Sequence, residues 1–280
     1  MNAGKTLFAV SARQESWRPI MRIALYSDLH LELMHGPPWR PAFPEVDVVI
    51  LAGDIGRHTH GLEWAADTFR SSSTGPRVIY VAGNHEYHGA HLGMLSELRK
   101  PQWKTMGVHF LENEVYALAG VRFLGGTLWS AFDLHGVENA EACMSITRRS
   151  ISDYWIIHAS GGKRLEPGDT LAMHRKSVQW LDAELAKPFD GKTVVVTHFT
   201  PHRKCVATEH EGSELSPYFN TDLAWLMEKR RIDVWCHGHT HTNNDFVAEN
   251  GCRVVSNQRG YPMEVEAGNM GFRPALVIDI

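Results

Sequence analysis

Short hydrophobic runs rich in β-branched residues alternate with amphipathic segments along most of the chain. The runs predict strands at 22–27, 46–52, 77–82, 108–111, 121–128, 193–197, 233–237, 244–248, 253–256 and 275–280. Apolar positions at helical spacing predict helices at 59–72, 90–100, 138–150, 170–186 and 221–230. This alternation is typical of an α/β protein.

Three of the predicted strands are apolar nearly throughout rather than at every second position. They are the strand at 46–52, in which only Asp47 is charged, and the strands at 77–82 and 193–197. Strands of this kind are buried on both faces, so we expect helices to cover the sheet. Ligands of open α/β sheets bind just beyond the carboxyl ends of the strands, which makes the residues there the candidates for chemistry.

The domain organisation follows from where periodicity is lost. Residues 1–20 show no clear pattern and are expected to be a loose N-terminal extension. The segment 130–170 has weak strand character and a predicted turn at Pro167, so it is either a helical insertion or lid, or simply connecting structure. Because the candidate site residues described below are spread over most of the chain, we expect a single domain over 21–280.

Composition excludes several classes of protein. The chain has 280 residues and a net charge of −4, which argues against a general basic surface for nucleic acid. No apolar stretch is long enough to span a membrane, and the N-terminal residues do not resemble a secretory signal. Four cysteines without paired spacing indicate reduced thiols and a cytoplasmic location.

Polar residues that can bind metal follow five of the predicted strands, in a chain with 17 histidines. Taken singly, most of them are more often a turn, a cap or a hydrogen-bonded structural residue than a ligand. Residues two apart in extended backbone project to the same side, so the pairs Asp28/His30 and His239/His241 could each hold one cation. Five such groups at strand ends are difficult to assemble by chance. They are Asp28-Leu-His30, Gly53-Asp54, Gly83-Asn84-His85-Glu86, His198 and Gly238-His239-Thr-His241.

In this order, the motifs resemble those of the calcineurin-like metallophosphoesterase superfamily. Two further stretches, 126–129 and 257–261, are similar to those of a bacterial, cytosolic and largely uncharacterised subgroup. The resemblance covers about 21–280 and implies an α/β fold of the α+β type, a four-layer sandwich in which two packed mixed sheets are flanked by helices.

The resemblance also implies a role for each motif residue. Asp28, His30 and His241 would bind one metal ion. Asn84, His198 and His239 would bind a second ion, and Asp54 would bridge the two. His85 would contact the phosphate, together with Asn84, or protonate the leaving oxygen.

Two positions depart from the pattern of the superfamily. Phe199 stands where many relatives carry a second histidine, which alters the pocket but not the ligand set. The arginine that protein phosphatases place after the bridging aspartate has no clean equivalent, since Arg57 comes three residues after Asp54. This weakens an interpretation as a protein phosphatase.

The expected reaction is hydrolysis of a small phosphodiester or phosphomonoester by in-line attack of a metal-bound hydroxide at a binuclear centre, with His85 as general acid. Imidazole and carboxylate ligands favour two transition-metal ions, manganese first, with iron, zinc or nickel as alternatives. A nuclease of the same superfamily, with nucleic acid as substrate only, would need a basic track, for which Glu228-Lys-Arg-Arg231 is the nearest candidate. A catalytically inactive binding scaffold should have lost some of these residues, and all eight positions are present.

Overall fold

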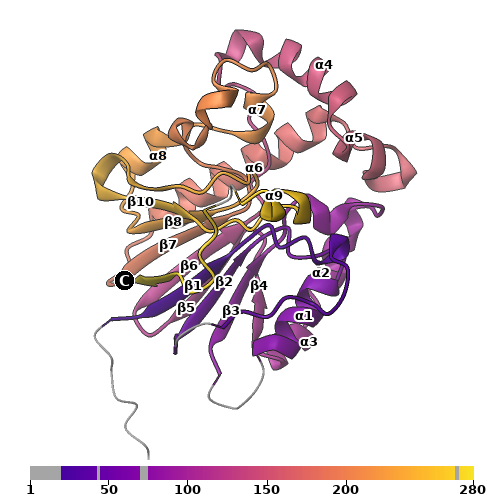
Figure 1. Ribbon diagram of the computed structural model, residues 1–280. Coiled ribbons are helices and arrows are strands. Elements are labelled where there is room, and N and C mark those ends of the chain that lie inside the picture. The colour runs from indigo at the N-terminus through magenta and orange to yellow at the C-terminus, as the bar shows by residue number, and fades with distance from the viewer. Residues whose placement is uncertain (1–19, 43–44, 70–74, 269–270) are drawn as a thin grey trace, which may run out of the picture.

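The computed structural model describes residues 20–42, 45–69, 75–268 and 271–280 (Figure 1). Apart from Ile20, the expected N-terminal extension therefore lies outside the described residues. So do residues 70–72 of the helix predicted at 59–72.

All ten predicted strands are present, with ends within two residues of the prediction. They are β1 (Arg22–Tyr26), β2 (Val48–Ala52), β3 (Arg77–Val81), β4 (Val108–Phe110), β6 (Val121–Gly126), β7 (Lys192–Thr197), β8 (Val234–His237), β9 (Asp245–Val247), β10 (Arg253–Ser256) and β11 (Val277–Asp279). One further strand, β5 (Glu114–Leu118), was not predicted.

The strands form two mixed sheets. The first has the order β11-β1-β2-β3-β4, and the second has the order β5-β6-β7-β8-β10-β9. In the first sheet β1 to β4 are parallel and β11 is antiparallel. In the second sheet β6, β7, β8 and β10 are parallel, with β5 and β9 antiparallel at the two edges. The carboxyl ends of the parallel strands in each sheet therefore lie at one edge of that sheet.

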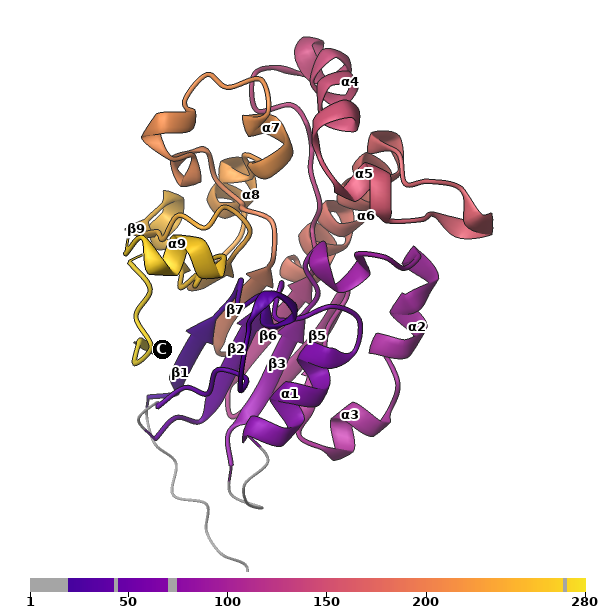
Figure 2. The same ribbon diagram turned by 45° about the vertical axis from the view of Figure 1, so that its right-hand side comes forward.

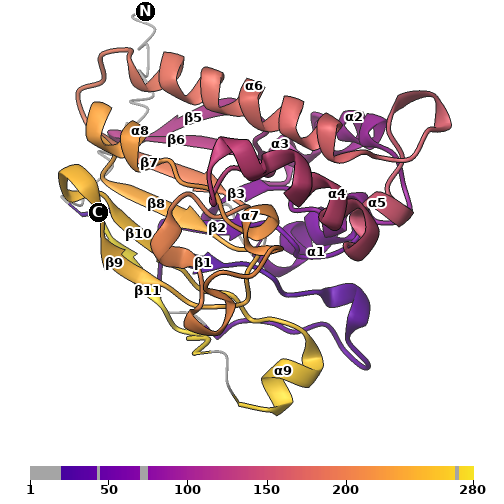
Figure 3. The same ribbon diagram turned by 90° about the horizontal axis from the view of Figure 1, so that it is seen from above.

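Two hydrophobic cores show why the central strands are apolar on both faces. In β2, Val48 and Ile50 pack between the sheets against residues such as Val194 of β7. The intervening Val49 and Leu51 belong to the core beneath the helices. Figure 3 shows α6 running along the outside of the six-stranded sheet. The expected four-layer arrangement, with two packed sheets flanked by helices, is confirmed.

The helices are more numerous than predicted. They are α1 (His60–Phe69), α2 (Leu95–Leu98), α3 (Gln102–Thr105), α4 (Ala140–Ser150), α5 (Asp153–Ile156), α6 (Pro167–Leu185), α7 (Ser216–Phe219), α8 (Ala224–Lys229) and α9 (Pro262–Glu266). The helix predicted at 90–100 is a 3₁₀ turn, Leu92–Met94, followed by α2. The four-residue to five-residue helices α3, α5, α7 and α9 were missed because one turn carries no helical period.

The turn predicted at Pro167 is wrong. Pro167 instead begins α6, and Glu166 and Asp169 form a reciprocal capping box around its first turn. Proline is well suited to the first position of a helix, where its missing N–H has no partner to lose. The segment 130–170 is helical, and α4, α5 and α7 gather beyond one end of the strands (Figure 2).

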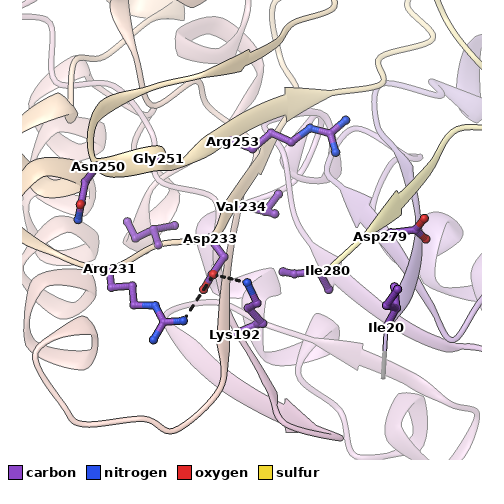
Figure 4. Close-up of a pocket in the computed structure, with 11 residues that line it drawn as sticks. Ile20, Lys192, Arg231, Asp233, Val234, Asn250, Gly251, Arg253, Asp279 and Ile280 are labelled. Carbon is purple, nitrogen blue, oxygen red and sulfur yellow. Dashed lines mark hydrogen bonds and ion pairs between the residues drawn. The ribbon is translucent and has the colours of Figure 1, made fainter. Parts of the chain in front are cut away.

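Membrane-spanning helices and surface hollows are two features that bear on where a site can lie. No helix within the described ranges is long and apolar enough to cross a membrane. A hollow at the amino ends of β7, β8 and β10 is lined by Lys192, Arg231 and Asp233 among others (Figure 4). Asp233 already pairs with Lys192 at 2.9 Å and with Arg231 at 3.8 Å, and the predicted site residues lie at the opposite ends of the strands.

Candidate metal centre

All eight predicted site residues lie in loops that follow parallel strands of the two sheets. The loops after β1, β2 and β3 supply five of them from the first sheet, and the loops after β7 and β8 supply three from the second. The structure brings all eight together where the carboxyl ends of both sheets meet. They are Asp28, His30, Asp54, Asn84, His85, His198, His239 and His241.

One half of the site consists of Asp28, His30 and His241, which we call the first group. Nε2 of His30 lies 3.0 Å from Nε2 of His241, and that nitrogen lies 3.6 Å from Oδ1 of Asp28. Nδ1 of His241 donates a 2.7 Å hydrogen bond to Glu264. That bond leaves the Nε2 lone pair of a neutral His241 facing the carboxylate of Asp28.

The other half consists of Asn84, His198 and His239, which we call the second group. Nδ1 of His198 donates to the Ala52 carbonyl oxygen at 2.9 Å, so Nε2 points into the site. This Nε2 lies 3.1 Å from Oδ1 of Asn84 and 3.2 Å from Nδ1 of His239.

Asp54 lies between the two groups. Its Oδ2 is 3.4 Å from Nε2 of His198 and 3.9 Å from Nε2 of His30. Its other oxygen, Oδ1, accepts a 2.9 Å hydrogen bond from the backbone N–H of His85. One carboxylate therefore reaches both halves of the site while it also fixes the loop after β3.

The donor atoms fit divalent cations. A neutral His198 that donates through Nδ1 presents a lone pair at Nε2, and this lone pair faces the oxygens of Asn84 and Asp54. Acceptors that face one another in a buried site need a positive charge between them. Burial by itself lowers the pKa of His198, but the Asp54 carboxylate outweighs it and raises the pKa to about 10. The site therefore requires a positive charge, which either a metal ion or a proton can provide.

The backbone at the ligands differs from the extended conformation expected from their i, i+2 spacing. Asp28, His30 and Asp54 have φ values of 53°, 47° and 54°, and His239 and His241 have values of 82° and 54°. Left-handed backbone at residues other than glycine is uncommon and concentrates at functional sites. The paired side chains do converge, but tight turns rather than strands bring them together.

Three glycines let these loops approach closely. A Cβ on Gly53 would lie 2.4 Å from Nδ1 of His198. A Cβ on Gly83 would lie 2.2 Å from Oδ1 of Asp54, and one on Gly238 would lie 2.6 Å from Oδ2 of Asp28. Any larger residue at these positions would displace a candidate ligand.

His85 stands at the edge of the centre with its side chain 10% exposed. Its Nε2 is 3.9 Å from Oδ2 of Asp54, and the Tyr261 hydroxyl is 3.4 Å from the same nitrogen. Its Nδ1 donates to Glu32 at 2.9 Å. Burial lowers the pKa of His85, but the nearby carboxylates of Asp54 and Glu32 raise it to about 9. The imidazole is therefore held as a proton donor facing the centre.

Sequence reasoning missed four acidic residues that support the site. Glu32 continues the alternation of Asp28 and His30, and Glu86 directly follows His85, so both carried a local signal. Glu86 is fully buried and accepts hydrogen bonds from the backbone of Asp54 and Gly83 and from the Tyr80 hydroxyl, at 2.7–3.0 Å. The other two, Asp153 and Glu264, come from α5 and α9 and had no signal in the sequence.

Phe199, the residue after His198, is buried beside the second group. Its ring centroid lies 3.9 Å from that of His239. An apolar ring therefore packs directly against one candidate ligand of the second group.

The fold and the site together define a two-sheet α/β protein with a centre of histidines and carboxylates at the strand ends. The family model of calcineurin-like phosphoesterases matches residues 21–243, and the chain belongs to this family. It is a metal-dependent phosphoester hydrolase.

The chain is similar to known proteins in sequence and to solved structures in fold. An uncharacterized protein of Acanthamoeba polyphaga mimivirus is 26% identical over 93% of this chain and 97% of its own length. The phosphopantetheinyl hydrolase of Mycobacterium tuberculosis has a similar structure, with a TM-score of 0.67, 18% identity and coverage of 92% of this chain and 95% of its own. A dimetal phosphatase from Danio rerio has a TM-score of 0.50 at 14% identity, with coverage of 86% and 88%. These structural likenesses establish the fold.

Proposed function

We propose that this phosphoesterase hydrolyses a small phosphodiester or phosphomonoester at a binuclear centre. The first group would hold one ion and the second group the other, with Asp54 within reach of both. The observation that carries the proposal is the pair of facing acceptor sets on either side of one buried carboxylate. Manganese is the proposed metal, with iron, zinc or nickel as alternatives, because the donors mix imidazole nitrogen with oxygen.

The remaining residues perform the proton transfer and the binding. Two bound divalent ions would lower the pKa of a shared water and stabilise both oxygens of an in-line displacement. Glu32 orients the His85 ring so that Nε2 faces the centre, where it protonates the leaving oxygen. His85 and Asn84 contact the phosphate. The low exposure of the site, with Asp28 and His30 fully buried, supports a small substrate.

The proposal treats residues 21–280 as one domain in the cytoplasm. Both sheets contribute ligands, and α5 contributes Asp153 to the centre, so the helical segment 130–170 belongs with the rest of the domain. All four cysteines are buried free thiols, which supports a reducing compartment.

The basic run at 228–231 does not support the nuclease alternative. In the basic run that could have formed a track, Lys229 and Arg230 pair with Asp182 at 2.8 Å and 2.7 Å. Arg231 lies 3.8 Å from Asp233. A polynucleotide would have to displace these carboxylates before it could bind the basic side chains.

The decisive experiment compares p-nitrophenyl phosphate with bis(p-nitrophenyl) phosphate. Metal-stripped protein is reconstituted in turn with Mn, Fe, Zn, Ni and Mg, and the bound ions are counted. We expect metal-dependent turnover with two ions per chain, and the ratio of the two rates assigns the enzyme as a phosphatase or a phosphodiesterase. A chain that binds two ions and hydrolyses neither ester would favour the inactive scaffold.

A further inference from the structure

A carboxylate from the helical segment beyond the strands reaches the second group. Asp153 is the first residue of α5, and only 1% of its surface is exposed. Its Oδ1 accepts hydrogen bonds from Nδ2 of Asn84 at 3.0 Å and from Nε2 of His88 at 2.8 Å. Its Oδ2 accepts one from the Tyr218 hydroxyl at 2.5 Å. This carboxylate therefore has three donors around it, two from the loop after β3 and one from α7.

These contacts determine which way the Asn84 amide points. A carboxylate without a proton can only accept hydrogen bonds, so the amide must turn its NH₂ group toward Asp153. The amide oxygen is then directed to the other side, where it lies 3.1 Å from Nε2 of His198. With the opposite orientation, two oxygens would face each other inside a buried site, at a cost of about 1–3 kcal/mol.

We propose that Asp153 is a positioning residue for the second metal ion. It holds Oδ1 of Asn84 toward the ligand nitrogen of His198, while His88 and Tyr218 hold the Asp153 carboxylate in place. The segment between β6 and β7 is accordingly a structural part of the metal centre and not a detachable lid. This inference rests on the proposed function, in which Asn84 is a ligand of the second ion.

The test is the isosteric variant Asp153→Asn. An asparagine keeps the shape of the side chain but removes its charge and replaces one of its two acceptor oxygens with an NH₂ group. The Asn84 amide and the Tyr218 hydroxyl can then no longer both donate to it, so the Asn84 amide is held less firmly. Loss of such a supporting contact costs about 10–100-fold in metal affinity. We expect that loss for one ion, with the ion of the first group retained. Mn²⁺ EPR should change from an exchange-coupled pair to a single-ion spectrum.

The matched control is Tyr154→Phe. Tyr154 neighbours Asp153 on α5, is also buried, and loses a 2.9 Å hydrogen bond to Thr170 without touching Asn84. We expect this variant to unfold at a lower temperature and still bind two ions. Thermal unfolding of the metal-free forms compares the structural cost of the two substitutions.

Two results would overturn the inference. One is an Asp153→Asn variant that binds both ions with wild-type affinity. The other is loss of both ions together in Asp153→Asn and to the same extent in Tyr154→Phe at equal stability, because the loss would then follow from destabilisation and not from the position of Asn84. Failure of the proposed function would be seen instead in wild-type protein, as two bound ions without hydrolysis of either ester.

Discussion

Replacement of Gly83 by alanine tests whether the loops after β2 and β3 form one centre. The backbone of Gly83 is not in the left-handed region, so alanine adds no backbone strain there. The added methyl group therefore acts only through its contacts. Its Cβ would lie 2.2 Å from Oδ1 of Asp54, 2.7 Å from Nε2 of His198 and 2.8 Å from the backbone nitrogen of Asp54. An ordinary contact starts near 3.4 Å, so the carboxylate has to move by 3.4 − 2.2 = 1.2 Å. Rotation of the Asp54 side chain does not remove the clash with its backbone nitrogen.

A shift of this size reaches the proposed bridge and one ligand at once. Misplacement of reacting groups by about 1 Å costs roughly 10²-fold in rate, and the crowding itself costs about 1–3 kcal/mol of folding stability. We expect Gly83→Ala to show both effects, together with weaker binding of both ions.

The assay combines metal content, kcat for both nitrophenyl esters and thermal unfolding. Gly168→Ala is the matched control, because Gly168 also lacks a left-handed φ and a Cβ there meets no heavy atom within 4 Å. It should leave the rate and the metal content unchanged. A Gly83→Ala enzyme with two tightly bound ions and wild-type kcat would refute the proposed position of Asp54.

Three further predictions use other parts of the molecule. Asp54→Asn should release both ions together and abolish turnover, since the bridge loses its charge; metal analysis showing one ion retained at full affinity would contradict the bridging role. His85→Ala should keep both ions and lose about 10²–10⁴-fold in rate, most for poor leaving groups, and an equal loss across a leaving-group series would argue against general-acid catalysis. Burial lowers the pKa of His174, so protons bind preferentially to the unfolded chain and stability falls as pH drops below about 6.5. His174→Gln should make chemical unfolding less sensitive to pH between about 6.5 and 5, and unchanged sensitivity would exclude this histidine as a cause.

The sequence predicted the central strands well because their residues are buried on both faces. The strand β5 was missed for the opposite reason. Glu114–Leu118 forms an edge strand with no fully buried residue, so nothing in its pattern distinguishes it from a loop. Short helices such as α5 depend on the surrounding structure rather than on their own four residues.

The sequence also predicted which residues meet at the strand ends, since residue type and position relative to a strand were sufficient for that. It did not predict how they are supported. Glu264 belongs to the capping box of α9, where it accepts a hydrogen bond from the backbone N–H of Tyr261 at 2.7 Å, yet the same side chain also orients His241. Asp153 similarly acts on Asn84 from a helix 69 residues away in sequence. Such partners are defined by tertiary structure, so no spacing rule in one sequence can reveal them.

The left-handed backbone at five of the candidate ligands has to be offset by contacts within the site. Each such residue costs about 1–2 kcal/mol, so the loops need compensating contacts. The ligand carboxylates provide several of them. Asp28 accepts hydrogen bonds from the backbone N–H of His239 at 3.0 Å and 3.2 Å, and Asp54 accepts one from that of His85. Because these bonds link loops that follow different strands, a displacement of one loop also moves the candidate ligands carried by another.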